Sequence, residues 1–399
     1  MEKRNIEMPS SVKFILDRLD AHGYRADIVG GPVRDHILGK CPSDYDITTS
    51  ALPETVERIF SDLRVIETGI KHGTVTLLID GEGYEVTTYR IDGEYKDSRR
   101  PESVEFTTDV TLDLSRRDFT MNAIAYNAKD GITDPFGGEE DIRASLIRAV
   151  GEPERRFRED ALRILRGIRF SSTLGFTIEE ETHKAILRTR ELLSNVSAER
   201  IYVEWKKLLS GDHALCVLDS YREVTRVFLP EIADTPLPDS EKFASADYMT
   251  RLLSLFCLSG RTGEEFYNAM RRLRTDSATA EDGRAVLEAL PECDLSSVGV
   301  GRLLSRLGEG RAILLASLAT LLGKTDDSAL SRMEDYLRQG RAYRLSDLKI
   351  GGRELVSLGF VGKDVGLVLA GLLDNVIDGV VENTEIALLE AARKYKIEP

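Results

Sequence analysis

Residues 26–46 of the chain read ADIVGGPVRDHILGKCPSDYD, a stretch that predicts a strand, a tight turn and a helix in succession. The apolar run 26–29 is typical of a short strand, and the two glycines after it allow a close backbone turn. Such a turn lets backbone N–H groups approach a phosphate, and Arg34 on the first helical turn could add positive charge. The stretch is not a P-loop, because Lys40 is followed by Cys41 rather than by serine or threonine.

Two aspartates, Asp44 and Asp46, close this stretch. Residues two apart on a strand point to one face, so these carboxylates could together hold Mg²⁺ ions whose shells substrate phosphates complete. Two such metals, about 3.5–4 Å apart, stabilise the attacking and leaving oxygens in phosphoryl transfer. A solvated turn is the alternative. Glu85, expected at the start of a later strand, is a candidate third catalytic carboxylate or else an exposed surface residue.

The flanking sequence predicts a mixed α/β region followed by a long helical one. Apolar residues at helical spacing mark residues 12–19, and a β-hairpin is expected over 73–89 with its turn at 80–83. From about Ile142 onward, β-branched alternation nearly disappears. Helices are expected over residues 159–174, 179–193, 198–209 and 330–337, with breaks at 236–240 and 323–327. The expected fold class is α+β, a small mixed α/β head followed by an elongated, all-helical remainder.

Composition narrows the class of protein. The chain has 399 residues, 42% of them apolar, and a net charge of −14. This length leaves room for two to four domains, and the acidic balance argues against nucleic-acid binding by a uniformly basic surface. The apolar stretch 312–323 is shorter than the ~20 residues of a membrane span, and the four cysteines form no C-x-x-C pair. A cytosolic chain without a disulfide framework is therefore expected.

Two arginine-rich segments stand out against this acidic background. RRDFTMNA at residues 116–123 is either a clamp for a triphosphate or ribose, or a salt-bridged helix start. Residues 142–170 hold eight arginines and four acidic residues, a local charge of +4. Asp160 and Arg163 are expected one helical turn apart, so that an acceptor and a forked donor face one flat polar ligand. A surface ion pair between them is the alternative.

Six ordered segments of the chain resemble the tRNA nucleotidyltransferases, the CCA-adding enzymes of the bacterial (class II) branch of the polymerase-β-like superfamily. The matching residues are 30–35, 44–46, 92–101, 116–123, 134–138 and 159–163. The resemblance covers residues 23–210, about half of the chain, and the remainder matches in length and helical character. It implies a nucleotidyltransferase head (1–141), a helical neck that recognises the base (142–210), a helical body (211–325) and a tRNA-binding tail (326–399), arranged like a seahorse.

The resemblance also implies roles for individual residues. Asp44 and Asp46 would bind the metals, and Asp160 and Arg163 would recognise the base. The residues that would bind the triphosphate or line the nucleotide pocket are Gly31, Arg34, Arg117, Arg166 and Arg169.

The chemistry of the bases agrees with this role of Asp160 and Arg163. A carboxylate accepts from the exocyclic amine that cytosine and adenine share, and a guanidinium donates to the adjacent ring nitrogen. Uracil and guanine present a carbonyl at that position, which would leave Asp160 facing an acceptor at a cost of ~1–3 kcal/mol. Protein groups can therefore select C and A without a nucleic-acid template.

The expected reaction is addition of C, C and A to the 3′ end of tRNA from CTP and ATP, with Mg²⁺ as cofactor and release of pyrophosphate. Its partners are tRNA, ATP and CTP, with no DNA and no membrane, in the cytoplasm. Addition of A alone and poly(A) synthesis remain open. Residues 92–101 resemble a loop that CC-adding relatives lack, which disfavours a CC-adding enzyme. The intact Asp44 and Asp46 disfavour a non-catalytic RNA-binding protein.

Overall fold

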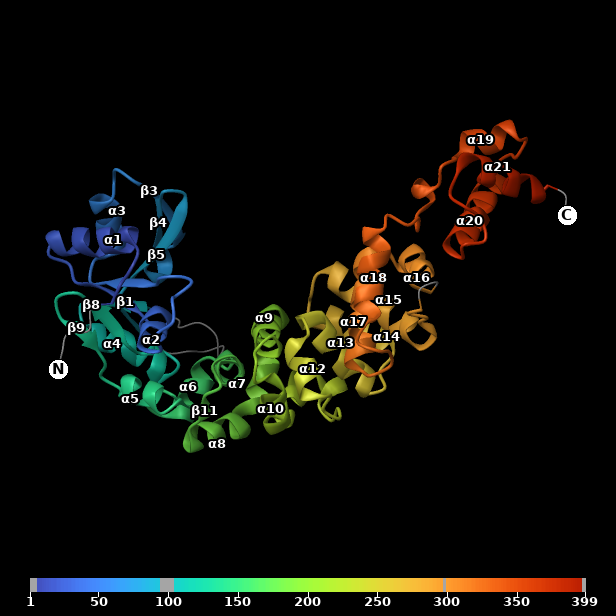
Figure 1. The fold of residues 1–399 in the computed structure, drawn as a ribbon. Helices are drawn as coiled ribbons and strands as arrows, with labels where there is room; N and C mark the ends of the chain where they lie inside the picture. Colours follow the sequence, from blue (N-terminus) through green and yellow to red (C-terminus); the bar gives the residue numbers. More distant parts are fainter. Residues whose placement is uncertain (1–5, 94–103, 297–298, 397–399) are drawn as a thin grey trace. The chain divides into compact units, whose positions relative to one another are not determined.

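The computed structural model describes residues 6–93, 104–296 and 299–396 (Figure 1). Contacts within the chain divide it into two compact units, Met1–Pro230 and Glu231–Pro399. The first unit contains the head and neck expected from the sequence and the first part of the body. The finer boundaries at residues 141, 210 and 325 stay predictions.

A seven-stranded sheet, in the order β3-β4-β5-β2-β1-β8-β9, forms the centre of the first unit. Its strands are β1 (Ala26–Val29), β2 (Ile47–Thr49), β3 (Arg64–Gly69), β4 (Thr74–Ile79), β5 (Glu82–Thr88), β8 (Ala125–Asn127) and β9 (Gly131–Thr133). Strands β2 and β5 pair in parallel, and the other neighbours pair antiparallel. Strand β1 is fully buried. Because β1 lies between β2 and β8, the glycine turn that follows it lies at the end of an interior strand of the sheet.

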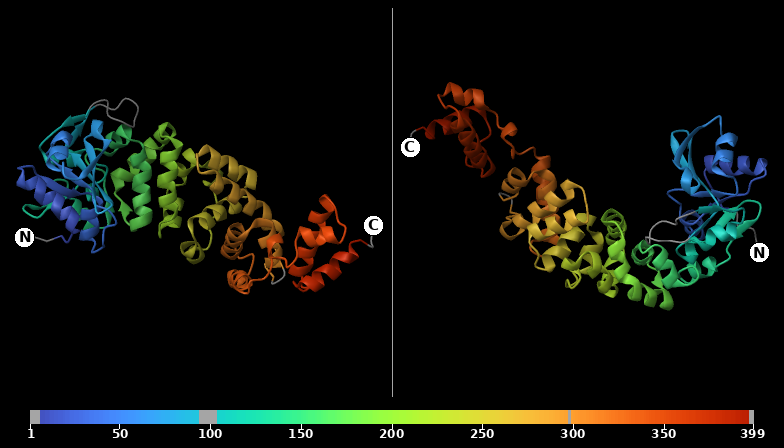
Figure 2. Two further views of the ribbon diagram at one scale, coloured as in Figure 1. Left: turned by 90° about the horizontal axis from the view of Figure 1, so that it is seen from above. Right: turned by 180° about the vertical axis from the view of Figure 1, so that it is seen from behind.

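Two smaller strand pairs complete the β-structure of the first unit. Strand β6 (Arg90–Asp92) pairs antiparallel with β7 (Val104–Phe106), and β10 (Leu146–Ile147) pairs parallel with β11 (Thr177–Ile178). The last pair is a small exception to the expected all-helical character after residue 142. Figure 2 shows that the large sheet is confined to the blue and cyan part of the ribbon and to the start of the green part.

Helices make up most of the remaining described chain. Those of the first unit are α1 (Ser10–Ala21), α2 (Gly31–Ile37), α3 (Pro53–Ile59), α4 (Val110–Ser115), α5 (Gly138–Arg143), α6 (Pro153–Glu159), α7 (Leu162–Leu174), α8 (Glu180–Thr189), α9 (Ala198–Leu209), α10 (Ala214–Ser220) and α11 (Arg222–Phe228). Short 3₁₀ turns cover Ile70–His72, Thr120–Asn122, Arg190–Asn195 and Pro230–Ile232. Helices α1 and α2 both contact β1.

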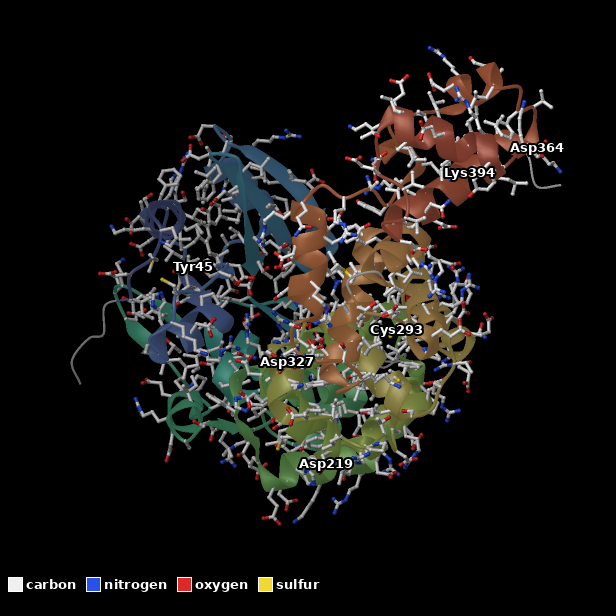
Figure 3. The ribbon with its side chains drawn as sticks, turned by 45° about the vertical axis from the view of Figure 1, so that its right-hand side comes forward. Tyr45, Asp219, Cys293, Asp327, Asp364 and Lys394 are labelled. Carbon is white, nitrogen blue, oxygen red and sulfur yellow. The ribbon has the colours of Figure 1, made fainter. Side chains whose placement is uncertain are left out.

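The second unit is helical throughout its described residues. Its helices are α12 (Ser240–Ser245), α13 (Tyr248–Leu258), α14 (Gly263–Arg272), α15 (Ser277–Ala289), α16 (Gly299–Leu307), α17 (Glu309–Leu321), α18 (Ala329–Arg338), α19 (Gly352–Ser357), α20 (Lys363–Ile377) and α21 (Glu385–Lys394), with 3₁₀ turns at Leu290–Glu292 and Leu345–Asp347. Both expected breaks are confirmed. The side chain of Lys242 on α12 pairs at 2.9 Å with Asp327, the residue of the second break that is labelled in Figure 3. Among the described helices, none is long and apolar enough to cross a membrane.

The sequence prediction is confirmed for α1 and for the β-hairpin. Helix α1 buries Val12, Ile15, Leu16 and Leu19, the four apolar residues at helical spacing. The hairpin turn is tighter than expected, because only Asp80 and Gly81 lie outside the two strands. Both residues have positive φ (52° and 87°), which matches the right-handed twist of the flanking strands.

The single helix expected over residues 159–174 is wrong. Helix α6 ends at Glu159 and α7 begins at Leu162, because Asp160 adopts an extended backbone with φ −142° and ψ 104°. Its side chain accepts a hydrogen bond from the Leu162 N–H at 3.1 Å, so it competes with the helical backbone for that donor. Asp160 therefore precedes α7 and does not stand one helical turn from Arg163 within it.

A buried carboxylate ties the sheet together. Asp27 on β1 is fully buried and accepts hydrogen bonds from Arg25, from the Tyr89 hydroxyl and from Asn127 Nδ2 at 2.7 Å. Burial, with the neighbouring Asp27 charge, raises the pKa of Tyr89 above its usual range, so its hydroxyl remains a donor. A buried charge is tolerated only when it is paired and hydrogen-bonded in this way.

We expect Tyr89→Phe to lower the free energy of unfolding of the first unit by about 1.5–3 kcal/mol, because it removes one donor to a buried charge. Urea unfolding followed by the fluorescence of the single tryptophan, the buried Trp205 of this unit, measures the change. Tyr84→Phe is the control, since that hydroxyl donates to Glu82 on the surface and its loss should cost less than about 0.5 kcal/mol. Equal effects of the two substitutions would contradict the expectation.

Candidate active site

The turn between β1 and α2 requires glycine. Gly30 has a φ of 79°, and its N–H donates to the Ile124 carbonyl at 3.0 Å. A Cβ at this position would lie 3.1 Å from Nη1 of Arg117. The turn therefore brings the backbone directly against a guanidinium, and Gly31 begins α2 immediately afterwards.

Asp44 and Asp46 lie just before β2 rather than on it, since the strand begins at Ile47. The Asp46 carbonyl accepts from the Val29 N–H at 3.1 Å, which fixes the backbone of Asp46 beside β1. Tyr45, labelled in Figure 3, lies between the two aspartates in the sequence, and its hydroxyl lies 3.3 Å from Nε2 of His36 on α2. The segment that carries the aspartates is thus held to β1 and α2, although it is not a strand.

Glu85 joins Asp46 at one hollow of about 230 Å³. The parallel register pairs Ile47 with Val86, so Asp46 and Glu85, one residue earlier on each segment, stand side by side. Glu85 lies within β5, not at its start as the sequence suggested, because the strand begins at Glu82. The same hollow is lined by the arginines Arg90, Arg116 and Arg117.

The electrostatics of Asp46 are those of a carboxylate in a crowded, charged hollow. Its side chain remains open to solvent, but desolvation by the walls raises the pKa of Asp46, and the Asp44 charge raises it further. Arg117 and Arg166 oppose this shift. Asp44 is thus close enough to Asp46 for the two charges to repel each other, which a bound cation would relieve.

The carboxylates of Asp44 and Asp46 are donors of the kind that Mg²⁺ takes. No group of three or more His, Cys, Asp or Glu side chains with metal-binding geometry occurs within residues 6–93, 104–296 and 299–396. Magnesium is usually held by one or two carboxylates, with water and substrate phosphates completing the shell. Asp44 and Asp46 supply such a pair.

Three of the predicted arginines gather around one buried ring, Phe170 of α7. The guanidinium carbons of Arg34, Arg166 and Arg169 lie 5.4, 5.5 and 3.6 Å from the ring centre. Arg34 comes from α2 and the other two from α7, so the ring brings together residues that are more than 130 positions apart in sequence. Cation–π contacts of this kind stabilise each positive charge in a partly desolvated place.

Acidic and amide side chains hold these arginines in place. Arg166 donates to Asp118 at 2.8 Å, and Arg169 donates to Glu204 of α9 at 2.9 Å. Burial alone would raise the pKa of Asp118, but the ion pair with Arg166 lowers it to about 2. Arg34 donates to Asn122 at 2.8 Å and to Asp35.

The positioning residues Asp118, Asn122 and Glu204 were missed as site residues in the sequence. Asp118 and Asn122 belong to the RRDFTMNA segment, so the motif itself carried a signal for them. Glu204 lies on an ordinary amphipathic helix, and nothing in its sequence context marks it.

Arg117 retains an unused donor. Its Nη2 lies 3.6 Å from the buried Asp113, and its Nε is buried without a hydrogen-bond partner among the residues that the structure describes. Desolvation lowers the pKa of Arg117, and the charges of Asp113 and Asp46 counteract part of that shift. A buried donor without an acceptor is costly. The Arg117 side chain also lines the hollow that contains Asp46, so its positive charge acts there.

Asp160 and Arg163 are not paired with each other. Arg163 is buried and donates to Glu159 at 2.9 Å and to the carbonyls of Arg156 and Arg116 at 3.2 and 2.8 Å. Asp160 instead accepts from Arg200 at 2.8 Å. The two side chains therefore form no ion pair with each other, and their role in recognising a base stays a prediction.

The predicted residues form three neighbouring groups within the first unit. One is the hollow with Asp46, Glu85 and Arg117, another surrounds Phe170, and the third contains Asp160 and Arg163. Arg166 is within electrostatic range of both Asp46 and Asp160, which connects the groups. Of the predicted loop 92–101, residues 94–101 lie outside the part of the chain that is described.

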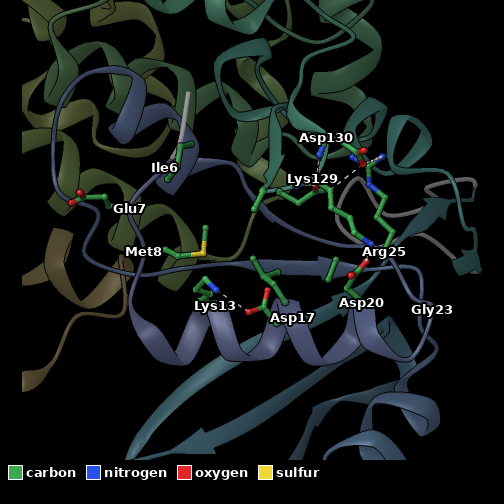
Figure 4. Close-up of a pocket in the computed structure, with 14 residues that line it drawn as sticks. Ile6, Glu7, Met8, Lys13, Asp17, Asp20, Gly23, Arg25, Lys129 and Asp130 are labelled. Carbon is green, nitrogen blue, oxygen red and sulfur yellow. Dashed lines mark hydrogen bonds and ion pairs between the residues drawn. The ribbon is translucent and has the colours of Figure 1, made fainter. Parts of the chain in front are cut away.

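A second hollow of about 770 Å³ lies beside α1, near the start of β1 (Figure 4). Its charged side chains pair with one another, as in the contacts Lys13 to Asp17 at 3.0 Å and Lys129 to Asp20 at 2.7 Å. None of the predicted site residues lines this hollow. It therefore adds nothing to the candidate active site.

Comparison with known proteins places this geometry in a family. The family model described as the poly A polymerase head domain matches residues 26–148, and that described as the probable RNA and SrmB-binding site of polymerase A matches residues 175–235. The crystal structure of the Bacillus stearothermophilus CCA-adding enzyme in complex with CTP is similar, with a TM-score of 0.82, 32% identity and 98% of each chain covered. The Thermotoga maritima CCA-adding enzyme complexed with tRNA shares the fold, with a TM-score of 0.69, 23% identity and coverage of 99% of this chain and 97% of that one.

Curated relatives give the same result along almost the whole chain. The CCA-adding enzyme of Geobacillus stearothermophilus is 37% identical over 384 residues, which cover 92% of this chain and 93% of that protein. The CCA-adding enzyme of Lactiplantibacillus plantarum is 36% identical over 397 residues, which cover 96% and 95%. With identity of this level over this coverage, the chain belongs to the family of CCA-adding enzymes, the tRNA nucleotidyltransferases.

Proposed function

We propose that this chain adds C, C and A to the 3′ end of tRNA from CTP and ATP, releasing pyrophosphate, in the cytoplasm. The observation that carries the proposal is the hollow that Asp46, Glu85 and Arg117 line together. Carboxylates for a cation and a guanidinium for a phosphate in one place are what nucleotidyl transfer requires. The solved complex of a relative with CTP supports a nucleotide as substrate.

In this proposal, Asp44 and Asp46 hold Mg²⁺, and Glu85, which lines the same hollow as Asp46, is a third catalytic carboxylate outside the metal pair. When bound, two such ions stabilise the attacking 3′ oxygen and the leaving pyrophosphate oxygen. Residues of the chain itself bind the triphosphate. Arg117, which lines the hollow, offers its guanidinium charge to the triphosphate, and Gly31 at the start of α2 offers its backbone N–H.

The arginines around Phe170 supply positive charges in fixed positions for binding the nucleotide. Arg34, Arg166 and Arg169 are each held by a carboxylate or an amide, so their charges are already oriented before a substrate arrives. Preorganised charge of this kind stabilises an anionic transition state without further reorganisation. At the neighbouring neck, Asp160 accepts from the exocyclic amine of cytosine or adenine, and Arg163 donates to the adjacent ring nitrogen.

Two alternative activities, addition of A alone and poly(A) synthesis, would use the same groups.

We expect the purified protein to extend tRNA lacking the whole CCA end with CTP, and tRNA lacking only the terminal adenosine with ATP. Single labelled nucleotides and three tRNA substrates, lacking three, two or one terminal nucleotides, provide the measurement. Extension of only the last substrate would identify an A-adding enzyme, and long A tracts on each of them a poly(A) polymerase.

We expect Asp46→Ala and Asp44→Ala each to reduce nucleotide addition to below about 1% of wild type, because the metals serve the chemical step. Binding of tRNA, measured by filter retention, should remain within about twofold. Asp17→Ala is the matched control, since this α1 aspartate pairs with Lys13 and does not line the hollow that contains Asp46. Activity above a few per cent in either active-site variant would refute the two-metal assignment.

We expect Asp160→Asn to relax discrimination against UTP and GTP by about tenfold or more, because an amide can donate to the carbonyl that a carboxylate rejects. Arg163→Ala should weaken CTP and ATP use together. Steady-state kcat/KM for all four nucleotides gives the answer. Asp109→Asn is the control, because it makes the same chemical change at another side chain that accepts from a helix-start N–H. An unchanged nucleotide preference in Asp160→Asn would reject the role of Asp160.

A further inference from the structure

The carboxylate of Asp160 is held by two different elements. One oxygen, Oδ1, accepts from the Leu162 N–H at 3.1 Å, and the other, Oδ2, accepts from Nη2 of Arg200 at 2.8 Å. Leu162 begins α7, whereas Arg200 lies in the first turn of α9, 40 residues further along the chain than Asp160. With both oxygens engaged, the carboxylate cannot rotate freely about its Cβ–Cγ bond.

Arg200 has no competing acceptor among the described residues. Its Nη1 is buried and has no hydrogen-bond partner in that part of the chain, while Nη2 is committed to Asp160. The side chains of Arg200 and Asp160 are 27% and 19% exposed, so the ion pair is largely shielded from water. A shielded pair with short geometry is stronger than the exposed pairs typical of helix surfaces.

Arg163 does not perform this task. Its guanidinium donates to Glu159 and to two backbone carbonyls, and none of its hydrogen bonds reaches Asp160. The orientation of the Asp160 carboxylate therefore depends on α9 and on the first turn of α7, which Asp160 precedes.

The same face of α9 also orients Arg166 and Arg169, two of the three arginines around Phe170. Arg200 and Glu204 are four residues apart, so they lie on one side of the helix. Glu204 accepts from Arg169 at 2.9 Å and lies 3.7 Å from Arg166. Helix α9 thus contacts Asp160 through Arg200. One turn later, it contacts Arg166 and Arg169 through Glu204.

We propose that Arg200 is a positioning residue for nucleotide selection, which holds the Asp160 carboxylate in the orientation that accepts an exocyclic amine and rejects a carbonyl. This inference rests on the proposed function of Asp160. With the Arg200 contact gone, Asp160 can turn away from a uracil or guanine carbonyl, so the penalty that excludes these bases falls. Arg200 itself touches neither the base nor the reacting atoms.

The test compares Arg200→Gln and Arg200→Lys in the full chain, with kcat/KM for CTP, ATP, UTP and GTP on tRNA lacking CCA. We expect Arg200→Gln to reduce the preference for CTP over UTP by at least about tenfold. Arg200→Lys, which retains the charge, should recover part of that preference. Arg188→Gln is the control, because Arg188 forms another ion pair of the neck, with Glu154 at 3.2 Å, and should leave the preference unchanged.

A merely structural role for Arg200 predicts a different result. It would lower kcat/KM for all four nucleotides by one common factor and leave their ratios intact, which would overturn the inference. Trp205, one helical turn and a residue further along α9, reports by its fluorescence whether each variant is folded. If Arg200→Gln is unfolded, the ratios measured for Arg200→Lys decide, since lysine cannot provide the same forked donor.

Asp160→Asn separates this inference from the proposed function. If Asp160→Asn leaves the nucleotide ratios unchanged, the role of Asp160 itself is wrong. If Asp160→Asn changes the ratios and both Arg200 variants do not, only the inference about Arg200 is wrong. In the double variant, the ratios should equal those of Asp160→Asn alone, because Arg200 acts through Asp160 and the two changes are not additive.

Discussion

The ion pair between Asp118 and Arg166 is the interaction on which the candidate site depends. Asp118 is buried, and without its partner the uncompensated charge would cost several kcal/mol. Asp118 belongs to the segment that follows α4, whereas Arg166 lies on α7, so the pair joins the sheet-bearing part of the first unit to its helical part. This connection determines where Arg166 and Arg169 of α7 lie relative to Asp46.

Close packing reinforces the same junction. Phe119, next to Asp118, meets Phe170 edge to face at 5.9 Å between ring centres. A Cβ at Gly167 of α7 would lie 2.9 Å from the Phe119 ring, so only glycine allows the helix to approach so closely. Polar and apolar contacts thus act together here: the rings exclude water, and the weaker screening strengthens the ion pairs around them.

The sequence predicted the elements of the fold better than the contacts of the site. The periodicity that identified α1 and the hairpin is local, so it is visible in a single stretch of residues. The break at Asp160 was missed because a carboxylate that accepts from a nearby N–H competes with the helix, and apolar spacing does not report this. Glu204 and Arg200 escaped notice for another reason: their partners are 35 and 40 residues distant, and only folding brings them together.

The net charge of the whole chain does not reveal how charged side chains are arranged at the candidate site. A protein with a net charge of −14 can still bind a polyanion if its positive charges are concentrated and held in place. Around Phe170, the acids Asp118 and Glu204 form fixed ion pairs with Arg166 and Arg169, unlike mobile counterions in solution. They fix the guanidinium groups of Arg166 and Arg169 beside the Phe170 ring. The carboxylates that make the chain acidic are, at this place, the means by which its cations are kept oriented.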